Sequence, residues 1–142
     1  MSAQHPTRHF PRIPLLFGLI GTIALLLPSF ASAAPSPSTS VKLSQSAQLI
    51  TPNQINVEVD LNCTAGNGYF VNVDVVEPTT SGFTIFGGGS NFGQCTGQQQ
   101  KIAVPVFSFC CAPPWQLGNA SATATGFAGP IDTDTKTINI GT

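Results

Sequence analysis

Histidine and arginine are absent from this chain after residue 12, and that absence excludes most catalytic chemistry. His5, His9, Arg8 and Arg12 all lie near the N-terminus. Without histidine a chain cannot pair a serine or cysteine nucleophile with an imidazole base, and it cannot build a histidine-bearing zinc site. Phosphoryl transfer also lacks its signature, because no glycine-rich loop precedes Lys-Ser or Lys-Thr. We therefore expect a protein that is not an enzyme and that holds no cofactor or metal.

The N-terminal residues have the composition of a secretory signal peptide. The basic segment is followed by an apolar run from Leu15 to Leu27, by Pro28, and by the small residues Ala31-Ser32-Ala33, which is the order that a signal peptidase reads. The apolar run is too short to span a bilayer. We predict a signal peptide at 1–33, a secreted protein that begins at Ala34, and no membrane span after cleavage.

Positive charge is scarce in the mature part. Three lysines stand against six acidic residues, so the formal charge after residue 33 is −3. Nucleic-acid binding needs a basic face that displaces counterions from phosphates, and anionic membranes attract basic segments. Nucleic acid and anionic membranes are therefore excluded as partners. The length of about 109 residues fits a single domain.

Strand-forming patterns dominate what is present. The clearest strand runs from Gln54 to Cys63, where apolar residues alternate with polar ones. A valine-rich strand from Tyr69 to Val76 follows a glycine-rich reversal at 65–68. Pro105 cannot donate to a ladder, so its strand lies at an edge or carries a bulge. The other strands are expected at 41–50 with a break near 45–46, and at 83–86, 101–109, 119–124 and 136–140.

About seven short strands without helical crossovers favour an all-β fold of two packed antiparallel sheets. Residues 34–40 are rich in proline and serine, and we interpret them as an extended linker. The folded domain is expected at 41–142. Gly87-Gly88-Gly89 is interpreted as a flexible loop.

Several segments occur in a characteristic order. A strand ending in Cys63 and a valine-rich strand are followed by Gln94-Cys95-Thr96-Gly97, and Leu117-Gly118-Asn119-Ala120 opens a late small-residue strand. This order resembles the secreted immunoglobulin-like sandwich proteins of bacteria, which implies an immunoglobulin-like two-sheet sandwich over 41–140. The antibody pattern has a tyrosine and a cysteine near 122 and 124, where this chain has alanine, so its inter-sheet disulfide is not expected. A more distant similarity in outline is to the apoproteins of enediyne chromoproteins, which are secreted acidic sandwiches with an apolar cleft.

Four cysteines behind a signal peptide predict disulfides. The sequence leaves three connectivities open, of which we favour Cys63 with Cys95. This bond would close a loop of about thirty residues and stabilise the fold by about 3–4 kcal/mol on the chain-entropy model. Cys110 and Cys111 are adjacent, and a vicinal disulfide there would fix a turn before the double proline. A redox role for this pair is disfavoured, because no histidine or arginine is available to lower a thiol pKa.

Acidic residues offer two further candidate sites. Glu58 and Asp60 share the outward face of one strand about 7 Å apart, a separation that suits an inverting glycosidase. A solvated face cannot raise the pKa of either carboxyl group, so we interpret them as the wet side of a sheet. Asp132-Thr133-Asp134 has the spacing of calcium ligands but no distal glutamate, and we interpret it as a surface turn.

Aromatic residues gather in two irregular regions, around Gly87 and around the adjacent cysteines. Most of these rings are expected to cap the ends of the core. The alternative is an exposed patch, which would mark an interaction site. The candidate binding surface consists of Phe83, Phe86, Phe92 and Trp115.

These observations favour a secreted, non-enzymatic immunoglobulin-like module with a binding or structural role at the cell exterior. Its expected partner is an extracellular protein or polymer. The alternative is a carrier that holds a small apolar ligand in an aromatic-lined cleft, which requires a cavity lined by those rings.

Processing provides the first test. The exported protein should begin at Ala34, because the small residues before it fit the cleavage specificity of signal peptidase. Intact-mass measurement and N-terminal sequencing of the secreted form check this start. A secreted form that still contains Arg12 would contradict the prediction.

Overall fold

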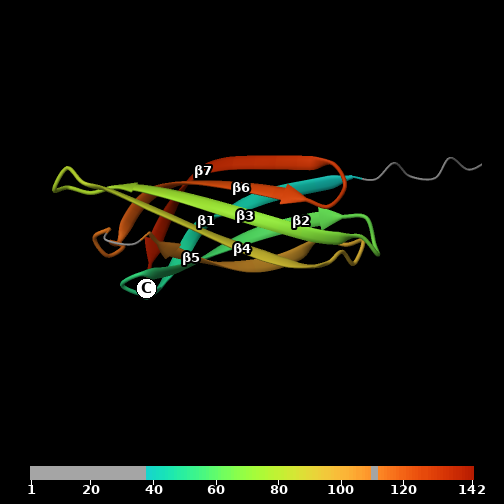
Figure 1. Ribbon diagram of the computed structural model, residues 1–142, viewed down its shortest axis with the longest axis horizontal. Helices are drawn as coiled ribbons and strands as arrows, with labels where there is room; N and C mark the ends of the chain where they lie inside the picture. Colours follow the sequence, from blue (N-terminus) through green and yellow to red (C-terminus); the bar gives the residue numbers. More distant parts are fainter. Residues whose placement is uncertain (1–37, 110–111) are drawn as a thin grey trace, which may run out of the picture. The chain divides into compact units, whose positions relative to one another are not determined.

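The computed structural model describes residues 38–109 and 112–142, which form seven β-strands (Figure 1). The strands are β1 Thr39–Thr51, β2 Gln54–Cys63, β3 Gly68–Pro78, β4 Thr84–Gln94, β5 Gln100–Ser108, β6 Gly118–Phe127 and β7 Ile131–Gly141. Within the described residues there is no helix that could cross a membrane. The expected signal peptide, Cys110, Cys111 and most of the linker lie outside the described residues.

Hydrogen bonding joins the strands into one closed order, β1-β2-β5-β4-β3-β6-β7. All neighbours are antiparallel except β1 and β7, which are parallel. Long pairings connect β1-β2-β5 and β4-β3-β6-β7. Two short pairings, which we call the β4–β5 seam and the β1–β7 seam, close the ring. The sequence predicted two separate sheets, and the structure instead has a barrel-like sheet, because the outer strands of the two groups meet along part of their length.

Each seam covers only a few residues of the described strands. At the β4–β5 seam, Gly87 faces Ser108 and Gly88 faces Phe107. At the β1–β7 seam, residues 46–48 pair with residues 139–141. β1 shifts register between Leu43 and Ala47, where a break was expected, but the strand continues through the shift. The shift lets the second half of β1 reach β7.

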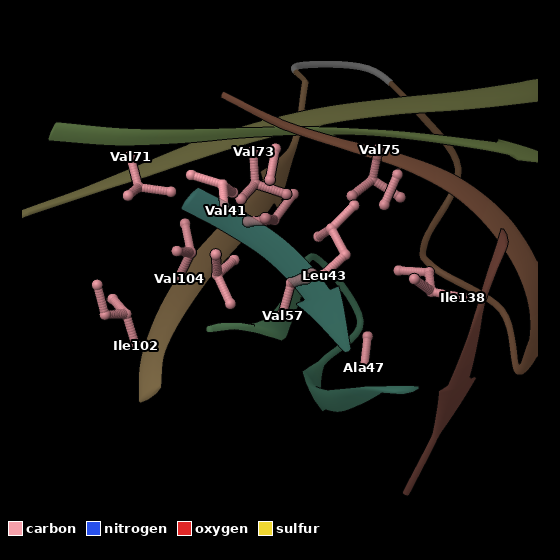
Figure 2. Close-up of a cluster of buried hydrophobic side chains, with 14 of the residues drawn as sticks. Val41, Leu43, Ala47, Val57, Val71, Val73, Val75, Ile102, Val104 and Ile138 are labelled. Carbon is pink, nitrogen blue, oxygen red and sulfur yellow. The ribbon is translucent and has the colours of Figure 1, made fainter. Parts of the chain in front are cut away.

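The core is made by the inward faces of the strands. Figure 2 shows part of it, with valine side chains of β3 facing side chains of β1, β2 and β5. The alternation predicted for β2 is confirmed, because Ile55, Val57, Val59 and Leu61 are fully buried. Ala122 and Ala124, at the positions where an antibody-type domain has tyrosine and cysteine, are also fully buried. Their small side chains leave no partner for a disulfide between β2 and β6.

The predicted disulfide between Cys63 and Cys95 is present, with an S–S distance of 2.05 Å. It joins the end of β2 to the residue that follows β4. Backbone hydrogen bonds reinforce this junction: Gly66 N donates to Cys95 O at 3.0 Å, and Cys95 N donates to Asn67 O at 2.8 Å. Gly66 has a φ of 83°, which glycine adopts without a steric penalty.

The interpretation of Gly87-Gly88-Gly89 as a flexible loop is wrong, because all three residues belong to β4. Their lack of side chains is what allows neighbouring groups to approach. A Cβ on Gly89 would collide with the carbonyl oxygen of Pro105, and a Cβ on Gly87 would collide with the indole of Trp115. The glycines therefore let β4 cross close to β5.

Strand boundaries also differ from the sequence-based expectation at two other places. β7 begins at Ile131, so Asp132-Thr133-Asp134 is part of a strand and not a surface turn. β1 begins at Thr39, inside the expected linker. β5 is not the edge strand that was expected, because it lies between β2 and β4 in the closed order. Pro105 itself is paired only with Asn56 of β2, since β5 pairs with β4 at residues 107 and 108.

A substitution at the crossing tests this role of glycine. Gly89→Ala should lower the free energy of unfolding by about 1–3 kcal/mol, the usual range for overpacking, because the new methyl group meets the backbone of β5. Gly141→Ala is the matched control, since a Cβ there meets no atom within 4 Å. Urea unfolding of both variants measures the difference, and equal midpoints would contradict the assignment.

Candidate functional site

The four residues of the predicted binding surface do not share one environment. Trp115 is only 3% exposed and belongs to the core, whereas Phe83, Phe86 and Phe92 are exposed, the last at 81%. The expectation that the rings cap the core therefore holds for Trp115, and it does not hold for the three phenylalanines. The structure does not bring the four together into one surface.

Trp115 holds the segment that precedes β6 against the rest of the domain. Its backbone amide donates to Pro52 O at 2.8 Å, and its indole lies beside Gly87 of β4. The indole Nε1 is buried and has no hydrogen-bond partner among the described residues. This residue closes the core beside the β4–β5 seam.

An aromatic row that the sequence-based analysis missed lies on the outward face of β4-β3-β6-β7. Phe70 of β3 is directly opposite Phe92 of β4 on one side and Phe127 of β6 on the other. Phe127 is in turn opposite Ile131 of β7. Because directly opposed residues of antiparallel strands project to the same face, these four side chains form one line. We call it the phenylalanine row.

The rings of the row are exposed, and two of them, on β3 and β6, are in contact. Phe70 and Phe127 are 43% and 40% exposed, and their ring centroids lie 6.0 Å apart at an interplanar angle of 47°. Aromatic pairs favour such tilted contacts. The sequence contained a signal for Phe70, since it occupies a polar position in the alternation of β3, next to Asn72 and Asp74. Phe127 gave a similar signal after Thr123 and Thr125 in β6.

A second aromatic cluster lies at the β4–β5 seam. It consists of Phe86, Phe107 and Phe109, all exposed. Phe109 N donates to Phe86 O at 2.9 Å, and a Cβ built on Gly88 would lie 3.5 Å from Phe109 Cζ. The ring of Phe109 therefore covers the glycine of β4.

Glu58 and Asp60 lie on the outward face of β2, as the alternation predicted. Glu58 Oε2 lies 3.7 Å from Lys101 Nζ, and both side chains are well exposed. Exposed pairs of this kind contribute at most about 1 kcal/mol.

Asp132 and Asp134 have a structural role at the β1–β7 seam. Val41 N donates to Asp132 Oδ2, and Leu43 N donates to Asp134 Oδ2, both at 2.8 Å. The hydrogen bond from Leu43 is the main cause that lowers the pKa of Asp134, and Lys136 at 3.3 Å adds to it. No group of three metal-ligating side chains occurs within residues 38–109 and 112–142. The carboxylates therefore replace a missing strand partner for β1.

Glu77 is a buried carboxyl group that the sequence-based analysis did not single out. It occupies an inward position at the end of β3, opposite Ile85, and is buried. Gln116 N donates to its Oε2 at 3.1 Å. Burial raises the pKa of Glu77 above the ordinary value of 4.5, and the hydrogen bond from Gln116 opposes this in part. A glutamate in phase with the valines of β3 was the available signal.

The surface of the described residues is hollowed at the outward sides of β1 and β2. The larger hollow has a volume of about 370 Å³ and is lined by residues of β1, β2, β5 and β7, including Gln48, Asn56, Glu58 and Asn139. The smaller has a volume of about 140 Å³ and includes Lys42. Neither is lined by an aromatic residue.

Comparisons with known proteins give no family for this chain. No protein-family model matches it, and no curated protein matches it. Among solved structures it is similar to the β-glucosidase from Listeria innocua in complex with glucose, with a TM-score of 0.46 and 13% identity, over 75% of this chain and 16% of that chain. It is also similar to CsgH from R. palustris, with a TM-score of 0.40 and 11% identity, over 72% and 92%.

The buried carboxyl group predicts a dependence of stability on pH. Because the folded-state pKa of Glu77 is raised, its contribution to stability is fully present below the ordinary pKa and is lost as pH rises through the folded-state value. Glu77→Gln keeps the acceptor for Gln116 without the charge. It should therefore melt at a higher temperature than the wild type at about pH 7 and at a similar temperature at about pH 4.

Thermal unfolding at both pH values measures this effect. Glu58→Gln is the matched control, because Glu58 is exposed, and it should not raise the melting temperature at neutral pH, since it removes only an exposed ion pair. A melting temperature of Glu77→Gln that falls further below the wild type at neutral pH than at acid pH would contradict the assigned cause.

Proposed function

We propose that this chain is a secreted, non-enzymatic immunoglobulin-like module that binds an extracellular macromolecule through exposed aromatic side chains. The observation that carries the proposal is the phenylalanine row, in which large apolar side chains project from paired strands into solvent. Contiguous exposed apolar side chains mark interaction sites in soluble proteins. The rings on β3, β4 and β6 are attached to a hydrogen-bonded sheet. Because the backbone beneath them is already ordered, binding costs little conformational entropy of the backbone.

The strand pairing supports the immunoglobulin-like part of this proposal. The groups β1-β2-β5 and β3-β6-β7 have the order of strands A-B-E and C-F-G of an immunoglobulin-like sandwich. The fourth strand differs, because it pairs mainly with β3 and only briefly with β5. The disulfide between Cys63 and Cys95 and the signal-peptide pattern of residues 1–33 support export to an oxidising compartment.

The binding role is favoured over the carrier role by where the rings lie. A carrier needs a concave apolar site that buries most of its ligand, and no aromatic side chain lines the hollows described above. An exposed row of rings on a sheet suits a partner that lies across the surface. The partner is therefore expected to be a macromolecule.

Photo-crosslinking tests the binding role directly. With p-benzoylphenylalanine at position 92 or 86, the secreted protein should form an adduct of higher mass when it is illuminated in the presence of the cells that produce it. The same group at position 50 is the matched control, because Ile50 is exposed on β1 outside both aromatic clusters. Equal yields at positions 92, 86 and 50, or no adduct at 92 and 86, would contradict the proposal.

A further inference from the structure

We propose that the phenylalanine row is a binding site for a neutral polysaccharide chain that lies across the strands. The inference rests on the proposed binding function and names the class of partner. Its observations are the linear order of the apolar side chains, the polar row beside them and the lack of positive charge on this face.

The shape of the row suits a linear ligand. Phe92, Phe70, Phe127 and Ile131 come from four neighbouring strands at the same level of the register. With neighbouring strands about 4.8 Å apart, the row is about 14 Å long, which is more than the width of one sugar ring. The faces of aromatic rings carry negative partial charge and attract the C–H groups that a pyranose presents on its flat side. A line of rings can therefore contact successive sugars of one chain.

Hydrogen-bonding groups run parallel to the row. Two residues further along each strand the register brings together Ser90, Asn72, Thr125 and Thr133, about 7 Å from the apolar side chains. Thr133 Oγ1 lies 3.4 Å from Thr125 Oγ1, and Asn72 Nδ2 donates to Asp74 Oδ2 at 2.8 Å. These contacts orient the polar groups, while their remaining donors and acceptors face solvent and fit the hydroxyl groups of a sugar.

Charge selects a neutral polymer over an anionic one. Among the described residues that the register places on the outward face of β4-β3-β6-β7, Asp74 is the one with a charged side chain. Lys136 points instead toward the β1–β7 seam, where its Nζ donates to Leu43 O at 2.9 Å. Without a cation on this face, a polymer of uronic acids or phosphates gains no electrostatic attraction.

A protein partner fits this face less well. The energetic centres of protein interfaces are compact clusters of buried anchors, in which serine and threonine are under-represented. Here the apolar groups form a single line, and the adjoining rows consist largely of serine, threonine and asparagine. The surface therefore lacks the compact apolar centre of such an interface.

A depletion assay tests the inference with the secreted protein and four probes. The neutral probes are microcrystalline cellulose, chitin and immobilised laminarin, and the anionic probe is immobilised polygalacturonate. The wild type should bind at least one neutral probe. Its affinity should be the same with and without added NaCl, because no ion pair contributes to binding. It should not bind polygalacturonate.

Substitutions assign the binding to the row. Phe92→Ala and Phe92→Leu should each weaken binding about tenfold or more, whereas Phe92→Tyr should retain it because the ring is kept. Phe83→Ala is the matched control, since Phe83 is an exposed ring outside the row, between β3 and β4. Melting temperatures should be unchanged in Phe92→Ala, because its ring contributes little to the core.

Three results would overturn the inference. The first is that the wild type binds none of the neutral probes. The second is that Phe92→Leu binds as well as the wild type. The third is that Phe83→Ala loses as much binding as Phe92→Ala. Crosslinking from position 92 to a protein, together with no binding to the neutral probes, would reject the polysaccharide and leave the proposed binding function standing. Absence of any crosslink from positions 92 and 86 would reject the binding function itself.

Discussion

Satisfaction of backbone hydrogen bonds where neighbouring strands diverge is the constraint on which the rest of the domain depends. A buried amide without a partner is costly, and both seams leave strands that separate after a few paired residues. In the first half of β1, the backbone amides of Val41 and Leu43 donate hydrogen bonds to the carboxylates of Asp132 and Asp134. At the other seam Asn91 Nδ2 donates to Ala103 O at 3.0 Å. Side chains thus continue the pairing that the backbone does not complete.

The composition of β4 follows from the same geometry. A strand that crosses a neighbour closely cannot carry side chains at the crossing, and Gly87, Gly88 and Gly89 meet this requirement. Beyond the crossing, the outward positions of β4 are free to carry Phe86 on one side and Phe92 on the other. The inward face at Gly87 receives the indole of Trp115. The glycines therefore leave room for the indole in the core and for the close approach of β5.

Alternation of apolar and polar residues was enough to predict β2, β3 and the seven-stranded all-β class, because burial of one face imposes a period of two. It failed at β4, where the inward positions are glycines that carry no hydrophobic signal, and at the start of β7, where they are Asp132 and Asp134. The closed order could not be predicted, since it depends on which strand edges meet in space. The phenylalanine row was missed for a related reason: Phe70 and Phe127 are far apart in sequence, and only the register makes them neighbours.

The carboxylates of the β1–β7 seam also determine how the domain meets other copies of itself. An unpaired strand edge is a template for aggregation between molecules, and the amides of Val41 and Leu43 would provide such an edge at the start of β1. Their engagement by Asp132 and Asp134 removes the template, and the lowered pKa of Asp134 keeps one of these acceptors ionised into mildly acidic conditions. Protection against edge-to-edge assembly at the start of β1 is therefore built into two side chains of β7.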